Sequence, residues 1–245
     1  MFSKVMKTTD FSKEYFAEPM ADDFKLKSIS NTTTKTIFWT GGFDSTALLL
    51  KYVKEGHSIH PIYIEHSMGW AKAKKEKFSQ EKILNEIKKI YPENKIRDVL
   101  IWDFNVINDL AVYKPLWRAL EELCSTLCVS FQYAAFRLCR DVFCPDFENK
   151  SDIEISIVKY DELWHMLEID KTKGENVKTF FKGFSFPLLD ESKKDIWNSA
   201  SPNEKEILKL TFSCESFDEY LNKTCSDRGL PYKEKCYPCK SRILD

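Results

Sequence analysis

The chain of 245 residues has no long apolar run and no marked excess of charge of either sign. No stretch approaches the roughly 20 apolar residues of a membrane-spanning helix, and the N-terminus lacks the apolar core of a secretory signal. The formal net charge is -1, so composition gives no reason to expect a nucleic-acid-binding or membrane-binding surface. We therefore expect a cytoplasmic protein with neither membrane association nor direct binding of nucleic acid.

Internal repeats and low-complexity segments are also absent, and 43% hydrophobic residues are enough for a sizeable core. Composition divides the chain into three parts. Residues 1–34 are polar and aromatic without clear periodicity and predict an N-terminal extension. Residues 35–200 predict an α/β domain with a helical insertion around 110–150, and residues 201–245 predict a small cysteine-rich segment.

Strand-like and helical patterns alternate along the first half of the predicted domain. Strands are expected at Thr36–Trp39, Ile59–Ile64 and Ile96–Trp102, with helices between them at Ala47–Val53 and Trp70–Ile90. This order predicts a Rossmann-like parallel sheet covered by helices. Ligands bind such a sheet beyond the carboxyl ends of its strands.

The second half of the domain has weaker patterns. Pro115–Val142 predicts one or two helices, Asp152–Tyr160 alternates as a strand would, and Glu162–Ile169 predicts a further helix.

Two of the seven glycines are adjacent, in the segment Thr40–Thr46 between the first predicted strand and helix. Gly41 and Gly42 allow a tight turn that brings several N–H groups to one anion, and the helix dipole adds to the attraction. Ser45 and the threonine after it supply hydroxyl donors. Asp44 suits this site if Mg²⁺ lies between its carboxylate and phosphate oxygens. The segment predicts a phosphate-binding loop with Asp44 as a magnesium ligand.

An ordinary glycine turn capped by Asp44 or Ser45 is the alternative interpretation of this segment. It is not a Walker A loop, because no Gly-Lys-Ser/Thr closes it, and it lacks the spacing of a dinucleotide fingerprint. It resembles the PP-loop of the ATP pyrophosphatases, usually Ser-Gly-Gly-x-Asp-Ser, with threonine in place of the first serine. The resemblance implies that the loop binds the pyrophosphate of ATP while a substrate oxygen attacks the α-phosphate. The implied ATP-binding residues are Trp39, Thr40, Gly41, Gly42, Phe43, Asp44, Ser45 and Thr46.

Glu65 follows the second predicted strand at the same edge of the sheet. It is a candidate contact for the nucleoside part of ATP, although the polarity of a loop alone would explain it.

Four of the eight cysteines fall in the last segment, at Cys214, Cys225, Cys236 and Cys239. Four thiolates satisfy a tetrahedral Zn²⁺ ion completely, which predicts a structural zinc site that supplies folding energy to a segment with little core. The alternatives are a redox Cys-x-x-Cys with unrelated neighbours and chance pairs of buried thiols. The remaining cysteines, for which core thiols are expected and a second metal site is the alternative, are Cys124, Cys128, Cys139 and Cys144.

The glycine loop, Pro187–Trp197 and the terminal cysteines together resemble the 7-cyano-7-deazaguanine synthases, the QueC family of queuosine biosynthesis. Pro187–Trp197 looks like the family's Pro-Leu segment followed by Lys-x-Glu-x-Trp. Thr211–Cys214 and Cys236–Arg242 are similar to its Ser/Thr-Cys and terminal Cys-x-x-Cys-x-x-Arg. The resemblance implies ATP, Mg²⁺, Zn²⁺ and a homodimer. It also implies that Lys193 neutralises phosphate charge as the adenylate forms, whereas the residue alone would suggest a surface lysine.

The substrate motifs of that family are altered in this chain. The nearest counterpart of its Pro-Gly-Arg-Asn is Pro115–Arg118, which makes Arg118 a candidate substrate residue. Nothing after Ile153–Val158 replaces its Asp-Cys-Arg loop. Ser226–Lys235 also separates two cysteines that are close together in the family.

The family chemistry implied is that of an ATP-dependent carbon–nitrogen ligase with Asp44, Ser45 and Lys193 as catalytic residues. It would adenylate 7-carboxy-7-deazaguanine and convert it with ammonia to the nitrile 7-cyano-7-deazaguanine. One alternative is a QueC-like member of a phage or antiphage system that stops at an amide, joins a deazaguanine to a partner protein, or serves DNA modification. Another is an inactive PP-loop interaction module. A tRNA-modifying PP-loop enzyme is disfavoured by the neutral charge and the lack of an added basic domain.

Overall fold

A computed structural model defines the fold. It describes residues 2–7, 34–66, 70–104, 136–137, 139–140, 153–161, 164, 183–214, 216–218 and 220–240. The predicted insertion around 110–150 and the helix expected at Glu162–Ile169 therefore lie almost entirely outside the described residues.

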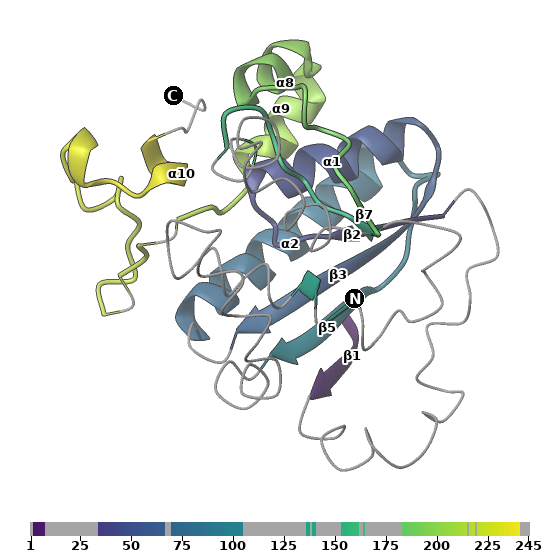
Figure 1. Ribbon diagram of the computed structural model, residues 1–245, viewed down its shortest axis with the longest axis horizontal. Coiled ribbons are helices and arrows are strands. Elements are labelled where there is room, and N and C mark those ends of the chain that lie inside the picture. The colour runs from purple at the N-terminus through teal and green to yellow at the C-terminus, as the bar shows by residue number, and fades with distance from the viewer. Residues whose placement is uncertain are drawn as a thin grey trace, which may run out of the picture.

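A seven-stranded sheet forms the centre of the molecule (Figure 1). Its strand order is β1-β5-β3-β2-β6-β7, with β4 also paired to β3, and every strand pair in the described part is parallel. The strands are β1 (Phe2–Lys7), β2 (Thr34–Phe38), β3 (Ser58–His66), β4 (Lys95–Ile96), β5 (Val99–Phe104), β6 (Ile153–Glu154) and β7 (Phe184–Ser185). The predicted Rossmann-like parallel α/β sheet is confirmed at this level.

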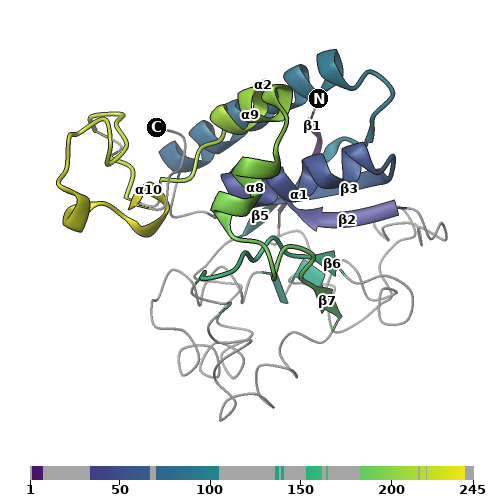
Figure 2. The same ribbon diagram turned by 90° about the horizontal axis from the view of Figure 1, so that it is seen from above.

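Helices cover one face of this sheet (Figure 2). The long helices α1 (Phe43–Lys54) and α2 (Trp70–Ile90) connect β2 to β3 and β3 to β4. The shorter helices α8 (Lys193–Ser199) and α9 (Pro202–Lys209) lie beside α1, and α9 contacts both long helices. A 3₁₀ turn, η3 (Tyr232–Glu234), and the short helix α10 (Tyr237–Lys240) belong to the C-terminal segment.

The core lies between the sheet and α1, α2 and α9. Its fully buried side chains include Trp39, Leu48, Leu49, Ile59, Ile83, Ile87 and Ile207. Helix α2 is amphipathic, but Phe78, an apolar residue of this helix, is 54% exposed and does not pack into the core. Instead, the Lys82 ammonium lies 4.3 Å from the centre of its ring.

Three segments differ from the sequence-based expectation. The alternation over Asp152–Tyr160 predicted a full strand, but only Ile153 and Glu154 pair with neighbouring strands. The chain then turns, with Tyr160 at φ 70°, and the Lys159 N–H bonds to a carbonyl outside the sheet. Phe2–Lys7, within the expected extension, forms the edge strand β1 beside β5. Helix α9, expected in the C-terminal segment, belongs to the core of the α/β domain.

Candidate functional site

The strand order reverses beside β2. From β2 the chain proceeds to β3 and then to β5 on one side, whereas β6 and β7 lie on the other side. In open parallel sheets, ligands bind outside the carboxyl ends of the strands where the order reverses in this way. The glycine loop leaves β2 at this point, and residues 155–161 leave β6 beside it. The topology therefore puts the predicted phosphate loop at the expected edge of the sheet.

Both glycines of the loop are closely packed against their neighbours. Gly41 has a φ of +78°, and a Cβ there would lie 3.0 Å from Gln80 Cγ and 3.2 Å from the Glu76 carbonyl oxygen. Gly42 has an ordinary φ of -77°. A Cβ at Gly42 would lie 3.1 Å from Ser213 Oγ, in the space where the loop meets the segment before Cys214. Only glycine fits at either position without movement of a neighbour.

Helix α1 begins at this loop with its first amides uncapped by its own N-cap residue, because Gly42 has no side chain. A helix N-terminus carries partial positive charge and favours anions. Thr40 Oγ1 lies 3.3 Å from Ser45 Oγ and accepts a 3.3 Å hydrogen bond from the Gly42 N–H. Two hydroxyls thus lie on the loop beside the start of the helix.

Trp39 and Thr46 lie behind the loop. Both are fully buried, and the Trp39 indole N–H donates to Thr46 Oγ1 across 3.2 Å. This contact supports the shape of the loop from the core side. Direct contact of either residue with a nucleotide stays a prediction.

The charged centre of the site is an ion pair between Asp44, in the first turn of α1, and Lys193, the first residue of α8. Lys193 Nζ lies 3.1 Å from Asp44 Oδ2, and the two side chains are 13% and 22% exposed. The Ser192 hydroxyl accepts from the Asp195 N–H, and this capping box fixes the start of α8 and so the position of Lys193. The structure thus brings together two residues that the sequence separates by most of the domain.

Burial raises the pKa of Asp44 to about 6, although the Lys193 ammonium opposes this shift; the Asp161 carboxylate adds to it. Asp44 Oδ1 is buried and has no hydrogen-bond partner among the described residues. A hard cation such as Mg²⁺ would satisfy this oxygen and lower the pKa, so the donor chemistry fits the predicted ion.

Glu65, the candidate nucleoside contact, lies in β3 close to its carboxyl end. Its Oε2 accepts from Lys77 Nζ of α2 at 2.7 Å, and its side chain is largely buried. Glu65 is therefore held at the expected edge of the sheet by its own ion pair. Arg118 lies outside the described residues.

Three loop contacts were missed by the sequence reasoning. Gln80 donates from Nε2 to the Trp39 carbonyl at 2.8 Å, and Ser79 Oγ donates to the Gly41 carbonyl at 3.4 Å. The Phe43 N–H donates to Ser213 Oγ at 3.1 Å, from a residue 170 positions later in the chain. Ser213 belongs to the family-like Ser-Cys pair, so a signal existed for it, whereas nothing in the sequence singles out Gln80.

The four C-terminal cysteines form a compact cluster. The Sγ atoms of Cys214, Cys225, Cys236 and Cys239 all lie within 4.8 Å of one another. The Cys214 and Cys225 sulfurs are 3.7 Å apart. Tetrahedral Zn–S bonds of about 2.3 Å place sulfurs about 3.8 Å apart, so the cluster could hold one metal ion such as zinc.

Three thiols of this cluster have shifted pKa values, and the shifts differ in direction. Burial raises the pKa of Cys214 to about 11 and, with the neighbouring Cys236 thiol, raises that of Cys239. Burial also acts upward on Cys225, but hydrogen bonds from the Cys236 backbone N–H and from neighbouring thiols outweigh it and lower the pKa to about 7. A bound divalent cation would favour the thiolate form of all four.

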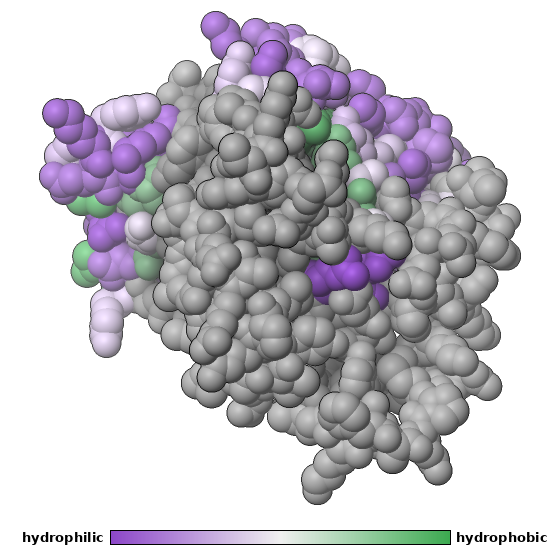
Figure 3. Space-filling view, viewed as in Figure 1, coloured by the Kyte–Doolittle hydropathy of each residue, from purple (hydrophilic) through white to green (hydrophobic). Residues whose placement is uncertain are grey.

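Apart from the cysteine cluster, the C-terminal segment has few buried apolar side chains that could stabilise it. Figure 3 shows mostly hydrophilic residues on its outer face, and Tyr220, Leu221 and Tyr232 are exposed. Cys214 and Cys225 are its buried apolar residues among those described. Of the other four cysteines, only Cys139 is described, and it is fully buried, as expected for a core thiol.

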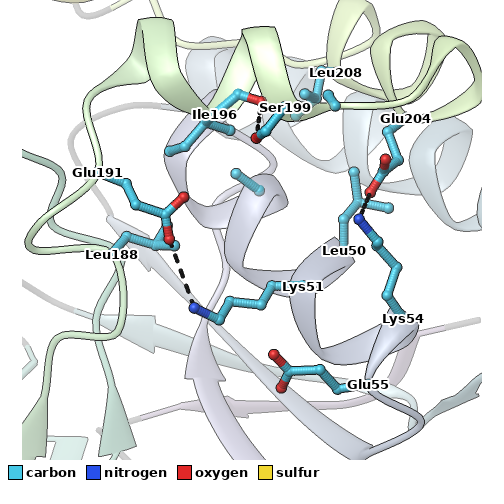
Figure 4. Close-up of a pocket in the computed structure, with 12 residues that line it drawn as sticks. Leu50, Lys51, Lys54, Glu55, Leu188, Glu191, Ile196, Ser199, Glu204 and Leu208 are labelled. Atoms are coloured by element: carbon cyan, nitrogen blue, oxygen red, sulfur yellow. Dashed lines mark hydrogen bonds and ion pairs between the residues drawn. The ribbon is translucent and has the colours of Figure 1, made fainter.

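A separate groove lies along α1, past the glycine loop (Figure 4). It has a volume of about 240 Å³ and an apolar floor that includes Leu50, Leu188 and Leu208. Ion pairs from Lys51 to Glu191 and from Lys54 to Glu204 lie at its rim. None of the sequence-predicted site residues lines it.

No protein-family model and no curated protein matches the chain. A solved structure described as a predicted subunit of tRNA methyltransferase from Methanocaldococcus jannaschii is similar at 15% sequence identity. The similarity covers 75% of this chain and 94% of that one, with a TM-score of 0.37, and an agreement this weak carries no functional conclusion. No helix within the described ranges is both long and apolar enough to cross a membrane.

Proposed function

We propose that the protein is an ATP-dependent carbon–nitrogen ligase of the PP-loop type that adenylates a carboxylate. The observation that carries the proposal is the partly buried Asp44–Lys193 pair at the start of α1, beside a loop whose two glycines are closely packed against their neighbours. A scaffold loop has no need of a desolvated carboxylate, a lysine and a helix N-terminus in one place. Zinc in the cysteine cluster and a QueC-like substrate, 7-carboxy-7-deazaguanine, complete the proposal.

The chain's own groups suit this chemistry. A carboxylate is a poor electrophile, so its oxygen first displaces pyrophosphate from the α-phosphate, and ammonia then attacks the acyl carbon as AMP leaves. The loop amides and Lys193 would bind the phosphate oxygens that carry the negative charge. Asp44 would hold Mg²⁺, which screens that charge. Ser45, with its hydroxyl 3.3 Å from that of Thr40, would orient the phosphates.

The test is to incubate the protein with Mg-ATP, 7-carboxy-7-deazaguanine and ammonium, and to measure AMP, pyrophosphate and product mass. We expect a nitrile as product, with two AMP and two pyrophosphate released for each nitrile, because a second ATP adenylates the amide oxygen and that oxygen leaves with AMP. An amide, or a mass increase on a partner protein, would assign the same chemistry to a divergent QueC-like enzyme. A protein that binds ATP without releasing pyrophosphate would be an interaction module, contrary to the proposal.

A matched pair of lysine variants sharpens this test. Lys193→Met removes the ammonium next to Asp44, and we expect pyrophosphate release to fall roughly a hundredfold or more, as on loss of a transition-state charge contact. Lys209→Met is the control, because Lys209 pairs with Glu206 on the exposed surface of α9. Equal effects of the two substitutions would contradict the role of Lys193.

A further inference from the structure

The segment between α9 and the cysteine cluster is bonded directly to the glycine loop. The Phe212 N–H donates to the Gly41 carbonyl at 3.1 Å, and the next residue, Ser213, accepts from the Phe43 N–H at 3.1 Å. The residue after that is Cys214, which belongs to the metal cluster. Ser213, which is hydrogen-bonded to the candidate phosphate loop, is therefore followed directly in the chain by Cys214, a candidate metal ligand.

Two further contacts hold residues 210–214 in place, one on each side of Ser213. Ser79 of α2 bonds to the Leu210 carbonyl, which fixes the beginning of the same segment. On the other side, the rings of Phe212 and Phe217 meet edge to face with centres 5.5 Å apart. The loop and the start of the cysteine segment are thus held in one arrangement, while the remainder of that segment has little core of its own.

We propose that the metal-bound cysteine cluster positions the glycine loop through Ser213, so that metal occupancy sets the affinity of the loop for triphosphate. The triphosphate half of this inference rests on the proposed function. Loss of the metal frees Cys214, and Ser213 then no longer anchors the loop at Phe43, so the other loop amides and hydroxyls lose the positions that a phosphate requires. Ser213 is a positioning residue, and the metal is a structural support for a site that it does not touch.

The coupling is tested first without any nucleotide. Hydrogen exchange of the amides of residues 41–46 is measured in zinc-loaded and zinc-stripped protein, and in Ser213→Ala. Stripping and Ser213→Ala should each speed exchange of the Phe43 amide by roughly tenfold or more, as expected when its hydrogen bond is lost. Ser199→Ala is the control, because that hydroxyl bonds to the Ile196 carbonyl within α8. Unchanged exchange in stripped protein would overturn the coupling.

The second measurement is calorimetric titration with Mg-ATP. Zinc-loaded Ser213→Ala should bind roughly ten- to a hundredfold more weakly than the unaltered protein, the loss typical of a hydrogen bond that positions a charged ligand site. Ser213→Thr keeps the hydroxyl and should restore most of the affinity. If the unaltered protein binds Mg-ATP and Ser213→Ala binds it equally well, the inference fails and the proposed function stands. If the unaltered protein binds none, the proposed function fails, and the exchange experiment still decides the coupling.

Discussion

Alanine substitutions at Gly41, Gly42 and Gly56 separate two effects on stability, the cost of a positive φ and the cost of a Cβ that crowds its neighbours. Gly56 has a φ of +75° with nothing near a new Cβ, Gly41 combines a φ of +78° with close neighbours, and Gly42 has close neighbours alone. A non-glycine residue in the left-handed region costs roughly 1–2 kcal/mol, and overpacking costs about 1–3 kcal/mol. We therefore expect unfolding free energies lowered by about 1 kcal/mol in Gly56→Ala, about 1 in Gly42→Ala and about 2–4 in Gly41→Ala.

Urea unfolding followed by tryptophan fluorescence measures these changes, and titration with Mg-ATP measures binding in the same variants. Gly42→Ala should lose ATP affinity far beyond its small loss of stability, because its Cβ displaces the Ser213 and Thr40 hydroxyls. Gly56→Ala, with a similar stability loss at the far end of α1, should bind ATP normally. Equal affinity in these two variants would refute the assignment of the loop as the phosphate site.

The remaining predictions concern charge, metal and packing. Because burial raises the folded-state pKa of Asp44 to about 6, its stability contribution is greatest below pH 3.8 and is lost as the pH rises through 6. Protons compete with Mg²⁺ for this carboxylate, so Mg²⁺-dependent ATP binding should weaken about tenfold per pH unit below 6; a flat calorimetric profile would contradict this. Cys225→Ser should abolish binding of one zinc per chain by elemental analysis, whereas Cys139→Ser should retain it. Ile207→Ala, on the buried face of α9, should lower the unfolding free energy by roughly 2–5 kcal/mol and leave ATP affinity unchanged below its melting temperature.

Local patterns in the sequence predict much of the fold. The amphipathic period over Trp70–Ile90 gives the bounds of α2, and the β-prone run ending at Trp39 gives the strand before the loop, because burial in each element follows its pattern with the exception of Phe78. The capping boxes that begin α8 and α9, Ser192 with Asp195 and Ser201 with Glu204, are also readable from sequence.

Contacts between distant segments could not be predicted in this way. The alternation after Ile153 is that of a strand, yet the strand ends at Glu154, and farther on the Lys159 N–H bonds to the Glu191 carbonyl rather than to a strand. The short sheet partner of β5 at Phe2–Lys7 has no periodic signal that assigns it to an edge. The bond from Phe43 to Ser213 depends on how α9 is placed over α1 and α2, which only the packed core determines.

The central claim is that the loop over Thr40–Thr46 binds the triphosphate of ATP. A crystal structure with Mg²⁺ and a non-hydrolysable ATP analogue tests it most directly. The account predicts the phosphates at the start of α1, with Mg²⁺ on Asp44 and Lys193 at a phosphate oxygen. An analogue bound elsewhere in the protein, with this loop unliganded, would contradict it.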